Sequence, residues 1–264
     1  MPHITITSDF GSSAASIAAV KGKLYRNLPD VLITDISHSI KPFDLQQAAY
    51  LFQQTYTHFP DNTFHFILND LYSDPHNQLL YAYENKQHIF CANNGLMTLL
   101  FNERPAEIFI LEDKPPQYDY LHILDVFIDQ VLYALQNVRM GIRHAHVSEL
   151  IIRSPLLPTI SPNMIEVQVL MIDHFGNIIF NIQRKSFEEI RKGRHFAIRF
   201  MRDEEINTIS QYYHDVPEGN KLCLFNASGY LEIAIYKGNA AMLLGMKESI
   251  GHNTFYNTVK IFFE

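Results

Sequence analysis

The sequence IIRSPLLPTISPN, residues 151–163, separates two parts of the chain that differ in their secondary-structure pattern. It contains three prolines, Pro155, Pro158 and Pro162, within eight positions. Proline lacks a backbone N–H donor and disfavours helix in the residue before it, so this segment is predicted to be extended. We therefore expect a first domain over residues 1–153, a proline-rich linker over 154–163 and a second domain over 164–264.

Before this linker, short runs rich in β-branched and aromatic residues alternate with segments whose apolar residues have helical spacing. Strands are predicted over 3–8, 31–37, 63–68, 79–84, 88–93 and 107–111, and helices over 14–27, 44–59, 94–102 and 125–137. The strands at 79–84 and 88–93 are expected to form a hairpin. The alternation is typical of an α/β domain with a mostly parallel, Rossmann-like sheet covered by helices.

After the linker, the pattern changes to short β-rich segments. They lie at 164–173, 177–182, 195–201, 221–236 and 258–263. This succession predicts a smaller all-β domain, a barrel or a sandwich. A chain of 264 residues is long enough for two such domains.

The composition favours a small-molecule partner. A formal net charge of -7 argues against binding to nucleic acid or to an anionic membrane, which need a basic surface. Cys91 and Cys223 show neither metal-ligand nor disulfide-framework spacing. The first residues lack a secretory-signal pattern, and no apolar run approaches the roughly 18 residues of a membrane span. We expect a cytoplasmic protein.

Polar side chains follow several of the predicted strands in the first domain. In open α/β sheets, ligands bind beyond the carboxyl ends of the strands, so these positions are candidates for a site. They are Asp9, Asp35, Asp70 and the pair Asn93–Asn94. A carboxylate such as Asp9 suits the two hydroxyls of a ribose, although Asp9 or Ser12 as a cap of the following helix is the alternative.

The segment FHFILNDLYSDPHNQ, residues 64–78, suggests a second kind of site. Asp70, Asp74 and His76 are metal-ligand types, but no helical His pairing supports them and DPHN is ordinary turn sequence. Asp70, nearest the strand end, is the stronger candidate for an active site. Gly-rich phosphate loops and the GxSxG serine-hydrolase pattern are absent, so phosphates are not expected to hold the substrate, and a nucleoside without phosphates stays open as a ligand.

Five segments resemble one family, in order and over nearly the whole chain. They are TSDFG (7–11), DISHSIKPFDLQQAAYLF (35–52), ANNGLM (92–97), IDHFGNIIFNI (172–182) and NASGYLEIAIYKGNAAMLLG (226–245). The chain thereby resembles the S-adenosyl-L-methionine (SAM) hydroxide adenosyltransferases, or SAM hydrolases, which are related to fluorinases and chlorinases. The resemblance implies a homotrimer that needs no cofactor, with SAM bound between the first domain of one subunit and the second domain of its neighbour.

The resemblance also implies roles for residues that match the family's motifs. Asp9 would hold the ribose hydroxyls, Phe43 would form an apolar wall, and Asn94 belongs to a substrate-binding turn. The other assignments are Asp173 for the methionine ammonium, Asn177 for the adenine edge and Ser228 for the methionine carboxylate. Each Asp or Asn beside a glycine is also ordinary turn chemistry.

Catalysis in this family is attributed to an Asp-Arg-His triad that activates water for attack on C5′ of SAM. Asp70 and His122 match the Asp and the His, whereas Asn77 stands where the family has arginine. The expected activity is hydrolysis of SAM to adenosine and L-methionine. The alternatives are a SAM- or adenosine-binding protein without turnover, a SAM-dependent halogenase, and a metal-dependent hydrolase that uses Asp70, Asp74 and His76.

Overall fold

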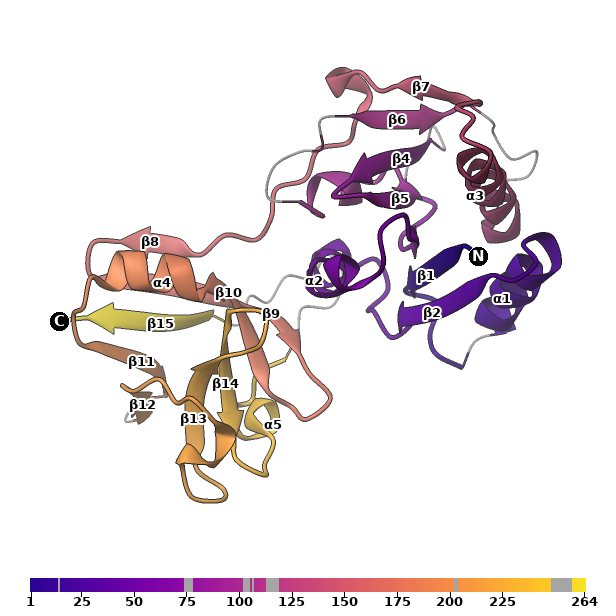
Figure 1. Ribbon diagram of the computed structural model, residues 1–264. Helices are drawn as coiled ribbons and strands as arrows, with labels where there is room; N and C mark the ends of the chain where they lie inside the picture. The colour runs from indigo at the N-terminus through magenta and orange to yellow at the C-terminus, as the bar shows by residue number, and fades with distance from the viewer. Residues whose placement is uncertain are drawn as a thin grey trace. The chain divides into compact units, whose positions relative to one another are not determined.

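The computed structural model consists of two compact units, Met1–Pro155 and Leu156–Glu264 (Figure 1). It describes residues 1–13, 15–73, 78–101, 105, 107–112, 119–201, 204–247 and 258–264. None of the helices in these ranges is long and apolar enough to cross a membrane. The segment predicted as a linker contains a short strand, β8 (Thr159–Ser161), which pairs with the next strand of the second unit.

The first unit is built on a seven-stranded mixed sheet of order β2-β1-β3-β5-β4-β6-β7. Its strands are β1 (His3–Ser8), β2 (Leu32–Ser37), β3 (Phe64–Leu68), β4 (Leu79–Glu84), β5 (Gln87–Ala92), β6 (Ile108–Leu111) and β7 (Ile142–His144). Strands β2, β1, β3 and β5 pair in parallel, whereas the pairs β5·β4, β4·β6 and β6·β7 are antiparallel.

The expectation of a mostly parallel sheet is therefore correct for only half of the strand pairs. The reason lies in the turn between β4 and β5, where Asn85 and Lys86 both have positive φ, 50° and 62°. Two consecutive residues of this kind form the tight turn that twists two strands into an antiparallel hairpin. The predicted hairpin at 79–93 is confirmed, and it makes the sheet mixed.

Helices cover both faces of this sheet. On one face, α1 (Ala15–Asn27) and α3 (Tyr120–Leu135) pack against β1, β3 and β5 through a core that includes Leu24, Phe66 and Phe127. On the other face, α2 (Leu45–Thr55) buries Phe52 against the sheet. The helix predicted at 94–102 is only a 3-10 turn, η2 (Leu96–Thr98). Two other 3-10 turns are η1 (Tyr56–His58) and η3 (Val147–Glu149).

The second unit is an eight-stranded antiparallel sheet that nearly closes into a barrel. Its order is β12-β11-β15-β9-β10-β14-β13, with β8 beside β9. The strands are β9 (Met164–Ile172), β10 (Ile178–Gln183), β11 (Phe196–Met201), β12 (Glu204–Ile206), β13 (Lys221–Phe225), β14 (Tyr230–Ile235) and β15 (Thr258–Phe263). A bridge between Ile209 and Cys223 links the segment after β12 to β13, which brings the two edges together.

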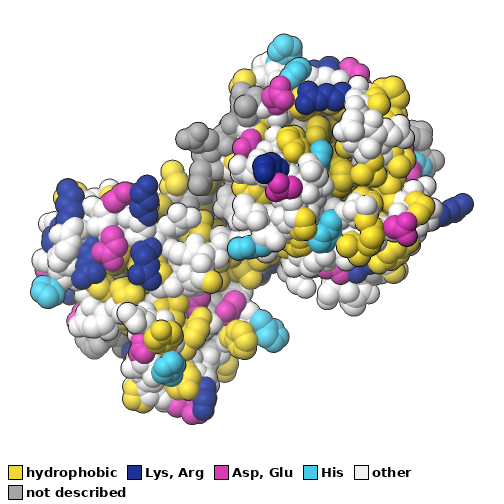
Figure 2. All heavy atoms as spheres, viewed as in Figure 1, with side chains coloured by type: hydrophobic (Ala, Val, Ile, Leu, Met, Phe, Trp, Pro, Cys, Tyr) yellow, Lys and Arg dark blue, Asp and Glu magenta, His cyan; other side chains and the backbone are white. Residues whose placement is uncertain are grey.

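The sequence predicted an all-β second unit, and this prediction is only partly correct. The unit also contains α4 (Arg184–Arg191), α5 (Ala240–Leu244) and the 3-10 turn η4 (Tyr213–Asp215). Helix α4 spans only eight residues, and its Phe187 is fully buried in the barrel core. In the view of Figure 2, basic and acidic side chains lie interspersed on this unit.

Candidate functional site

Asp9 joins two loops at the carboxyl edge of the first unit's sheet. Its Oδ2 atom accepts hydrogen bonds from the backbone N–H groups of Phe43 and Asp70, each at 3.1 Å. Both bonds go to loops outside α1. Burial raises the pKa of the Asp9 carboxyl, although both backbone hydrogen bonds oppose the shift. The carboxylate retains acceptor capacity for a ligand hydroxyl.

Asp70 follows β3 directly and is nearly buried, with 8% of its surface exposed. Its backbone is held in the left-handed region at φ 47° by the bond to Asp9. Ser73 Oγ donates a short hydrogen bond to Asp70 Oδ1. The neighbouring Asn69 is fully buried, and its side-chain amide has no partner within the described residues. Asp70 is thus fixed at the strand end, as the sequence predicted for its position.

Asn94 ties the end of β5 to the end of β3. Its Nδ2 donates to the backbone carbonyls of Asn69, at 2.9 Å, and Asp70, at 3.0 Å, while its Oδ1 accepts from Leu96 N at 3.0 Å. The side chain is almost fully buried. The described structure therefore brings Asp9, Asp70 and Asn94 together through a continuous set of hydrogen bonds.

Arg153, which was not predicted from the sequence, is hydrogen-bonded to the turn that carries Asn94. Arg153 Nε donates to Asn94 O at 2.9 Å, and its backbone N–H donates to Thr98 Oγ1 at 3.0 Å. Thr98 Oγ1 in turn donates to the carbonyls of Gly95 and Arg153. Gly95 has φ 95°, and a Cβ there would overlap the Arg153 side chain. No motif marks Arg153, since the contact spans 59 positions of the chain.

Asn93, the residue before Asn94, is also hydrogen-bonded to the segment that leads to Arg153. Asn93 Nδ2 donates to Glu149 O at 2.8 Å, and Asn93 Oδ1 accepts from Ile151 N at 3.0 Å. Gln46 of α2 also donates to Ser154 O at 3.1 Å. The residues that enter the proline-rich segment are thus hydrogen-bonded to the turn that carries Asn94.

His38 is another residue that the sequence reasoning did not single out. Its Nδ1 is 2.8 Å from Ser8 Oγ, and its Nε2 is 3.0 Å from Asp35 Oδ1. Burial opposes ionisation of Asp35, but hydrogen bonds from Lys21 and His38 outweigh it and lower the pKa of that carboxyl. Asp35, a strand-end candidate, therefore serves to hold His38 and the end of β1.

His122 lies in the first turn of α3. Asp119 caps this helix by accepting from the backbone N–H groups of Leu121 and His122, and its Oδ2 lies 2.8 Å from His122 Nδ1. These bonds to His122 hold the pKa of Asp119 below its ordinary value. Phe10, next to Asp9, packs edge-on against Tyr120 at 5.4 Å, so the start of α3 lies beside the loop after β1.

Phe43 and Asn77 complete the predictions for the first unit. Phe43 has φ 67° and is 70% exposed, so its ring is accessible beside the Asp9 carboxylate. Asn77 lies outside the described residues, as do Asp74 and His76 of the metal alternative. Among the residues that are described, no group of three His, Cys, Asp or Glu side chains is placed to hold a metal ion.

In the second unit, Asp173 and Asn177 form a single turn between β9 and β10. Asp173 Oδ1 accepts from Phe175 N at 2.9 Å and Asn177 N at 2.8 Å, and Oδ2 accepts from Asn177 Nδ2 at 2.9 Å. Gly176 at φ 81° packs directly on Asn239, leaving no space for a side chain. Ser228 lies in the turn between β13 and β14, where its N–H donates to Asn226 Oδ1 at 3.1 Å.

Glu232, which was not predicted, is hydrogen-bonded to Asn226 of the turn that carries Ser228. It is only 3% exposed, and it accepts from Tyr213 Oη at 2.7 Å. Burial raises the pKa of Glu232, and the nearby Asp173 charge acts in the same direction, while hydrogen bonds from Tyr213 and Asn226 oppose it. A glutamate in the otherwise apolar strand YLEIAI is the signal that sequence reading alone offered.

Both units match one known protein family. Residues 4–141 match the SAM hydroxide adenosyltransferase N-terminal domain, and residues 167–250 match the SAM hydroxide adenosyltransferase C-terminal domain. The chain belongs to the SAM hydroxide adenosyltransferase family. The resemblance seen in the sequence motifs is therefore confirmed at the level of the family.

Individual relatives agree with this placement. A protein named (R)-S-adenosyl-L-methionine hydrolase from Methanocaldococcus jannaschii is 25% identical over 92% of each chain. One of the same name from Thermus thermophilus is 27% identical over 95% of this chain and 98% of its own. An uncharacterized conserved protein from Thermotoga maritima has a crystal structure with the same fold, at a TM-score of 0.79 and 21% identity over 98% of this chain and 99% of that one.

Proposed function

We propose that this protein hydrolyses SAM to adenosine and L-methionine. The observation that carries the proposal is the match of both units, in order, to the two domains of the SAM hydroxide adenosyltransferase family. The relatives named SAM hydrolases extend over more than nine-tenths of the chain, which supports the same activity here.

In the proposed reaction, the oxygen of water forms a bond to C5′ of SAM while the C5′–sulfur bond breaks and its electron pair goes to sulfur. The sulfonium leaves as a neutral thioether, so no acid is needed to protonate it. The protein must instead supply an aligned and partly desolvated water. We assign Asp70 to accept a hydrogen bond from this water.

His122 is proposed to take the proton that the water releases. Its pairing with Asp119 supports this role, because a carboxylate that accepts from Nδ1–H fixes the tautomer in which Nε2 is the basic nitrogen. The start of α3 lies beside the loop after β1, where Asp9 is expected to bind the ribose. The third proposed catalytic residue is Asn77, which stands in the position of the family's arginine.

The remaining assignments concern substrate binding. In the first unit, Asp9 binds the ribose hydroxyls, Phe43 provides an apolar wall and Asn94 fixes the turn beside the substrate. In the second unit, Asp173 binds the methionine ammonium, Asn177 the adenine edge and Ser228 the methionine carboxylate. The hydrogen bonds that order each of these turns without a ligand support a preformed site.

We further propose a cytoplasmic homotrimer that acts without a cofactor, with each substrate shared between the first unit of one subunit and the second unit of a neighbour. The family resemblance supports this arrangement. Light scattering coupled to size-exclusion chromatography should give three times the mass of one chain. Dialysis against a chelator should leave the rate of SAM hydrolysis unchanged, whereas loss of activity would favour the metal-dependent alternative.

The direct test is incubation of the purified protein with SAM in water enriched in oxygen-18. We expect equimolar adenosine and methionine, with one labelled oxygen in the adenosine 5′-hydroxyl, because the C5′–sulfur bond is the one that breaks. Product that forms only with added chloride or fluoride, as a 5′-halo nucleoside, would establish the halogenase alternative. Absence of any product would refute the hydrolase.

The replacement of the family's arginine by Asn77 allows a second test, which compares wild type with Asn77→Arg. Asn77 can donate a hydrogen bond but carries no charge, so Asn77→Arg should raise the turnover of SAM if the family's triad operates here. Binding of SAM by calorimetry with no product from either protein would instead identify a binding protein without turnover.

A further inference from the structure

A cavity lies in the first unit, at the edge of the sheet opposite to Asp9, Asp70 and Asn94. It has a volume of about 660 Å³, within the usual size of small-molecule sites. Its lining includes His3, Phe64 and His88, the first or second residues of β1, β3 and β5. These strands are parallel, so their first residues lie at the other edge from the proposed substrate residues, none of which lines the cavity.

The sheet provides this cavity with an aromatic wall. His88 stacks on Phe64, with ring centroids 4.4 Å apart and an interplanar angle of 15°, and on Tyr81 at 5.9 Å and 15°. The ring of Tyr83 lies 4.8 Å from that of His88. The opposite wall comes from the last turns of α3, including Ala134. A flat ring is the ligand shape that such stacked surfaces accept.

Tyr81 and His88 are polar side chains of this wall. Burial raises the pKa of Tyr81 to about 12 and lowers that of His88 to about 4, so both are neutral at pH 7. Tyr81 Oη and His88 Nδ1 lie 2.9 Å apart and share one hydrogen bond.

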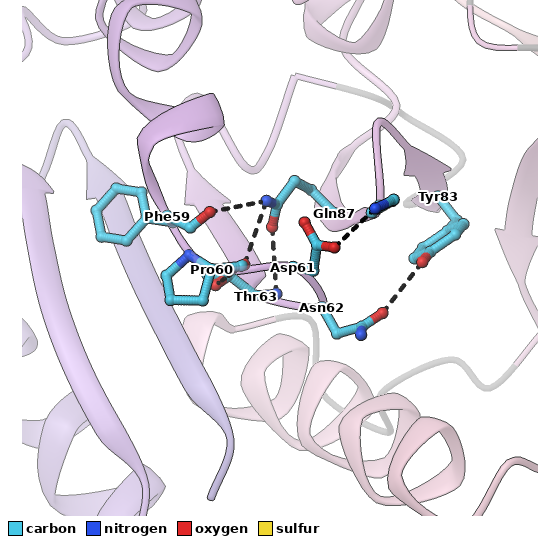
Figure 3. Close-up of polar contacts among 8 residues, drawn as sticks. Phe59, Pro60, Asp61, Asn62, Thr63, Tyr83 and Gln87 are labelled. Atoms are coloured by element: carbon cyan, nitrogen blue, oxygen red, sulfur yellow. Dashed lines mark hydrogen bonds and ion pairs between the residues drawn. The ribbon is translucent and has the colours of Figure 1, made fainter.

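The turn at residues 59–63 presents a hydrogen-bond donor. Figure 3 shows the Gln87 amide bonded to this turn, by Nε2 to the carbonyls of Phe59 and Pro60 and by Oε1 from Thr63 N, each at 3.2 Å. Tyr83 Oη donates to Asn62 Oδ1 at 3.0 Å, which leaves the Asn62 Nδ2 group as a donor. The turn is thus held in place before any ligand arrives.

Asp61 and Arg139 are the charged residues of the cavity lining, and the Glu107 carboxylate also acts on the Tyr81 hydroxyl. Asp61 is paired with Lys86 at 2.9 Å, so its negative charge is compensated. The Arg139 guanidinium lies over the Phe109 ring at 5.8 Å, close enough to Tyr81 to affect its hydroxyl, and it forms no ion pair with a described residue. A guanidinium of this kind is suited to a planar carboxylate.

We propose that this cavity binds a small planar aromatic carboxylate, with its ring on the Tyr81–Tyr83–His88 wall and its anionic group toward Arg139. The site is separate from the proposed substrate site and uses none of its residues. It would give the protein a second ligand that is chemically unlike SAM, which is cationic at sulfur.

The test uses benzoate as the probe, with saturation-transfer NMR and calorimetry on the full-length protein. Benzoate should bind saturably and outcompete two controls, cyclohexanecarboxylate, which lacks the flat ring, and benzamide, which lacks the charge. Equal binding of either control would overturn the aromatic or the anionic requirement, and no saturable binding of benzoate would overturn the site.

Paired variants locate the probe. Arg139→Gln should weaken benzoate about tenfold by removing the cation, and Tyr83→Leu should weaken it several-fold by removing a ring. Arg184→Gln and Tyr212→Leu, which change an aromatic-stacked arginine and an exposed tyrosine of the second unit, should have no effect. Asp9→Ala should also leave benzoate binding unchanged, and a loss there would place the probe in the proposed substrate site instead. Unchanged binding by Arg139→Gln would refute the proposal.

Discussion

At the scale of single residues, the proposed chemistry depends on how firmly one carboxylate is held. Asp70 receives contacts from three directions: its N–H donates to Asp9, its side chain accepts from Ser73, and its carbonyl accepts from Asn94. A carboxylate fixed in this way needs little rearrangement to align a water. Holding reacting groups in the correct geometry in advance lowers the barrier to reaction.

Asp70→Asn should therefore lower kcat for SAM hydrolysis by about a hundredfold or more, because the amide keeps the shape but loses the negative charge. The Michaelis constant should change little. The matched control is Asp125→Asn on α3, whose carboxylate pairs with Lys23 at the surface. Both variants are assayed by chromatography of adenosine, and equal kcat values for Asp70→Asn and wild type would rule out the assignment.

Arg153 is expected to act through Asn94. Removing its Nε–H in Arg153→Ala should lower kcat/KM about tenfold, the effect of losing one hydrogen bond of roughly 1.4 kcal/mol in the ordering of the turn. Arg153→Lys should not restore the rate, since lysine has no donor at the Nε position. Arg26→Ala, at the end of α1, is the control. A normal rate in Arg153→Ala would show that the Arg153–Asn94 hydrogen bond is unnecessary for turnover.

At the scale of elements, the turn after β5 combines an unusual backbone with close packing. Gly95→Ala should destabilise the first unit by about 2 kcal/mol, from the cost of φ 95° and from overlap with Arg153. Gly219→Ala, with φ 82° and open space around the new methyl, isolates the backbone cost. Chemical denaturation gives the free energy of unfolding of Gly95→Ala, of Gly219→Ala and of the double variant Gly95→Ala with Arg153→Ala. Comparison of the three separates the backbone cost from the overlap with Arg153. The double variant should regain part of the loss, and failure to do so would refute the packing argument.

The sheet itself carries a buried histidine. His65 on β3 is 2.7 Å from Thr5 Oγ1, and burial lowers its pKa to about 4 from an ordinary value of 6.5. The unfolded chain therefore binds this proton more readily than the folded one. Stability should be complete above pH 6.5 and should decrease as the pH falls toward 4, by up to about 3 kcal/mol for this group.

Urea denaturation between pH 4 and 7 measures this slope. His88 contributes in the same direction, so His65→Gln should remove only part of the pH dependence. His58→Gln, which changes an exposed histidine, should retain all of it. A slope that is identical in His65→Gln and wild type would show that His65 does not titrate as proposed.

At the scale of the whole molecule, each unit has its own hydrophobic core and one buried cysteine. Cys91 belongs to the core beneath α2, and Cys223 belongs to the barrel core. Burial raises the pKa of both thiols to about 12, so neither is a reactive thiolate in the folded protein.

We expect no reaction of the native protein with a disulfide reagent over minutes, and full reaction in denaturant. The variants Cys91→Ser and Cys223→Ser each leave one reporter, so their labelling midpoints in urea follow the two units separately. Because the cores are separate, the midpoints should differ. Coincident midpoints would show that the two units unfold as one.

The sequence by itself determined the order of most strands and helices, because alternating and helical apolar spacing is a local property. It also placed Asp9, Asp70 and Asn94 at strand ends and revealed the family through ordered motifs. The hairpin that contains the Asn85–Lys86 turn was predicted, but a sheet with as many antiparallel as parallel strand pairs was not, and the short α4 was missed. Only the tertiary structure decided which residues meet: Arg153 with Asn94, Glu232 with Tyr213, and the aromatic wall with Arg139. Those contacts join residues distant in the chain, and neither spacing nor composition encodes them.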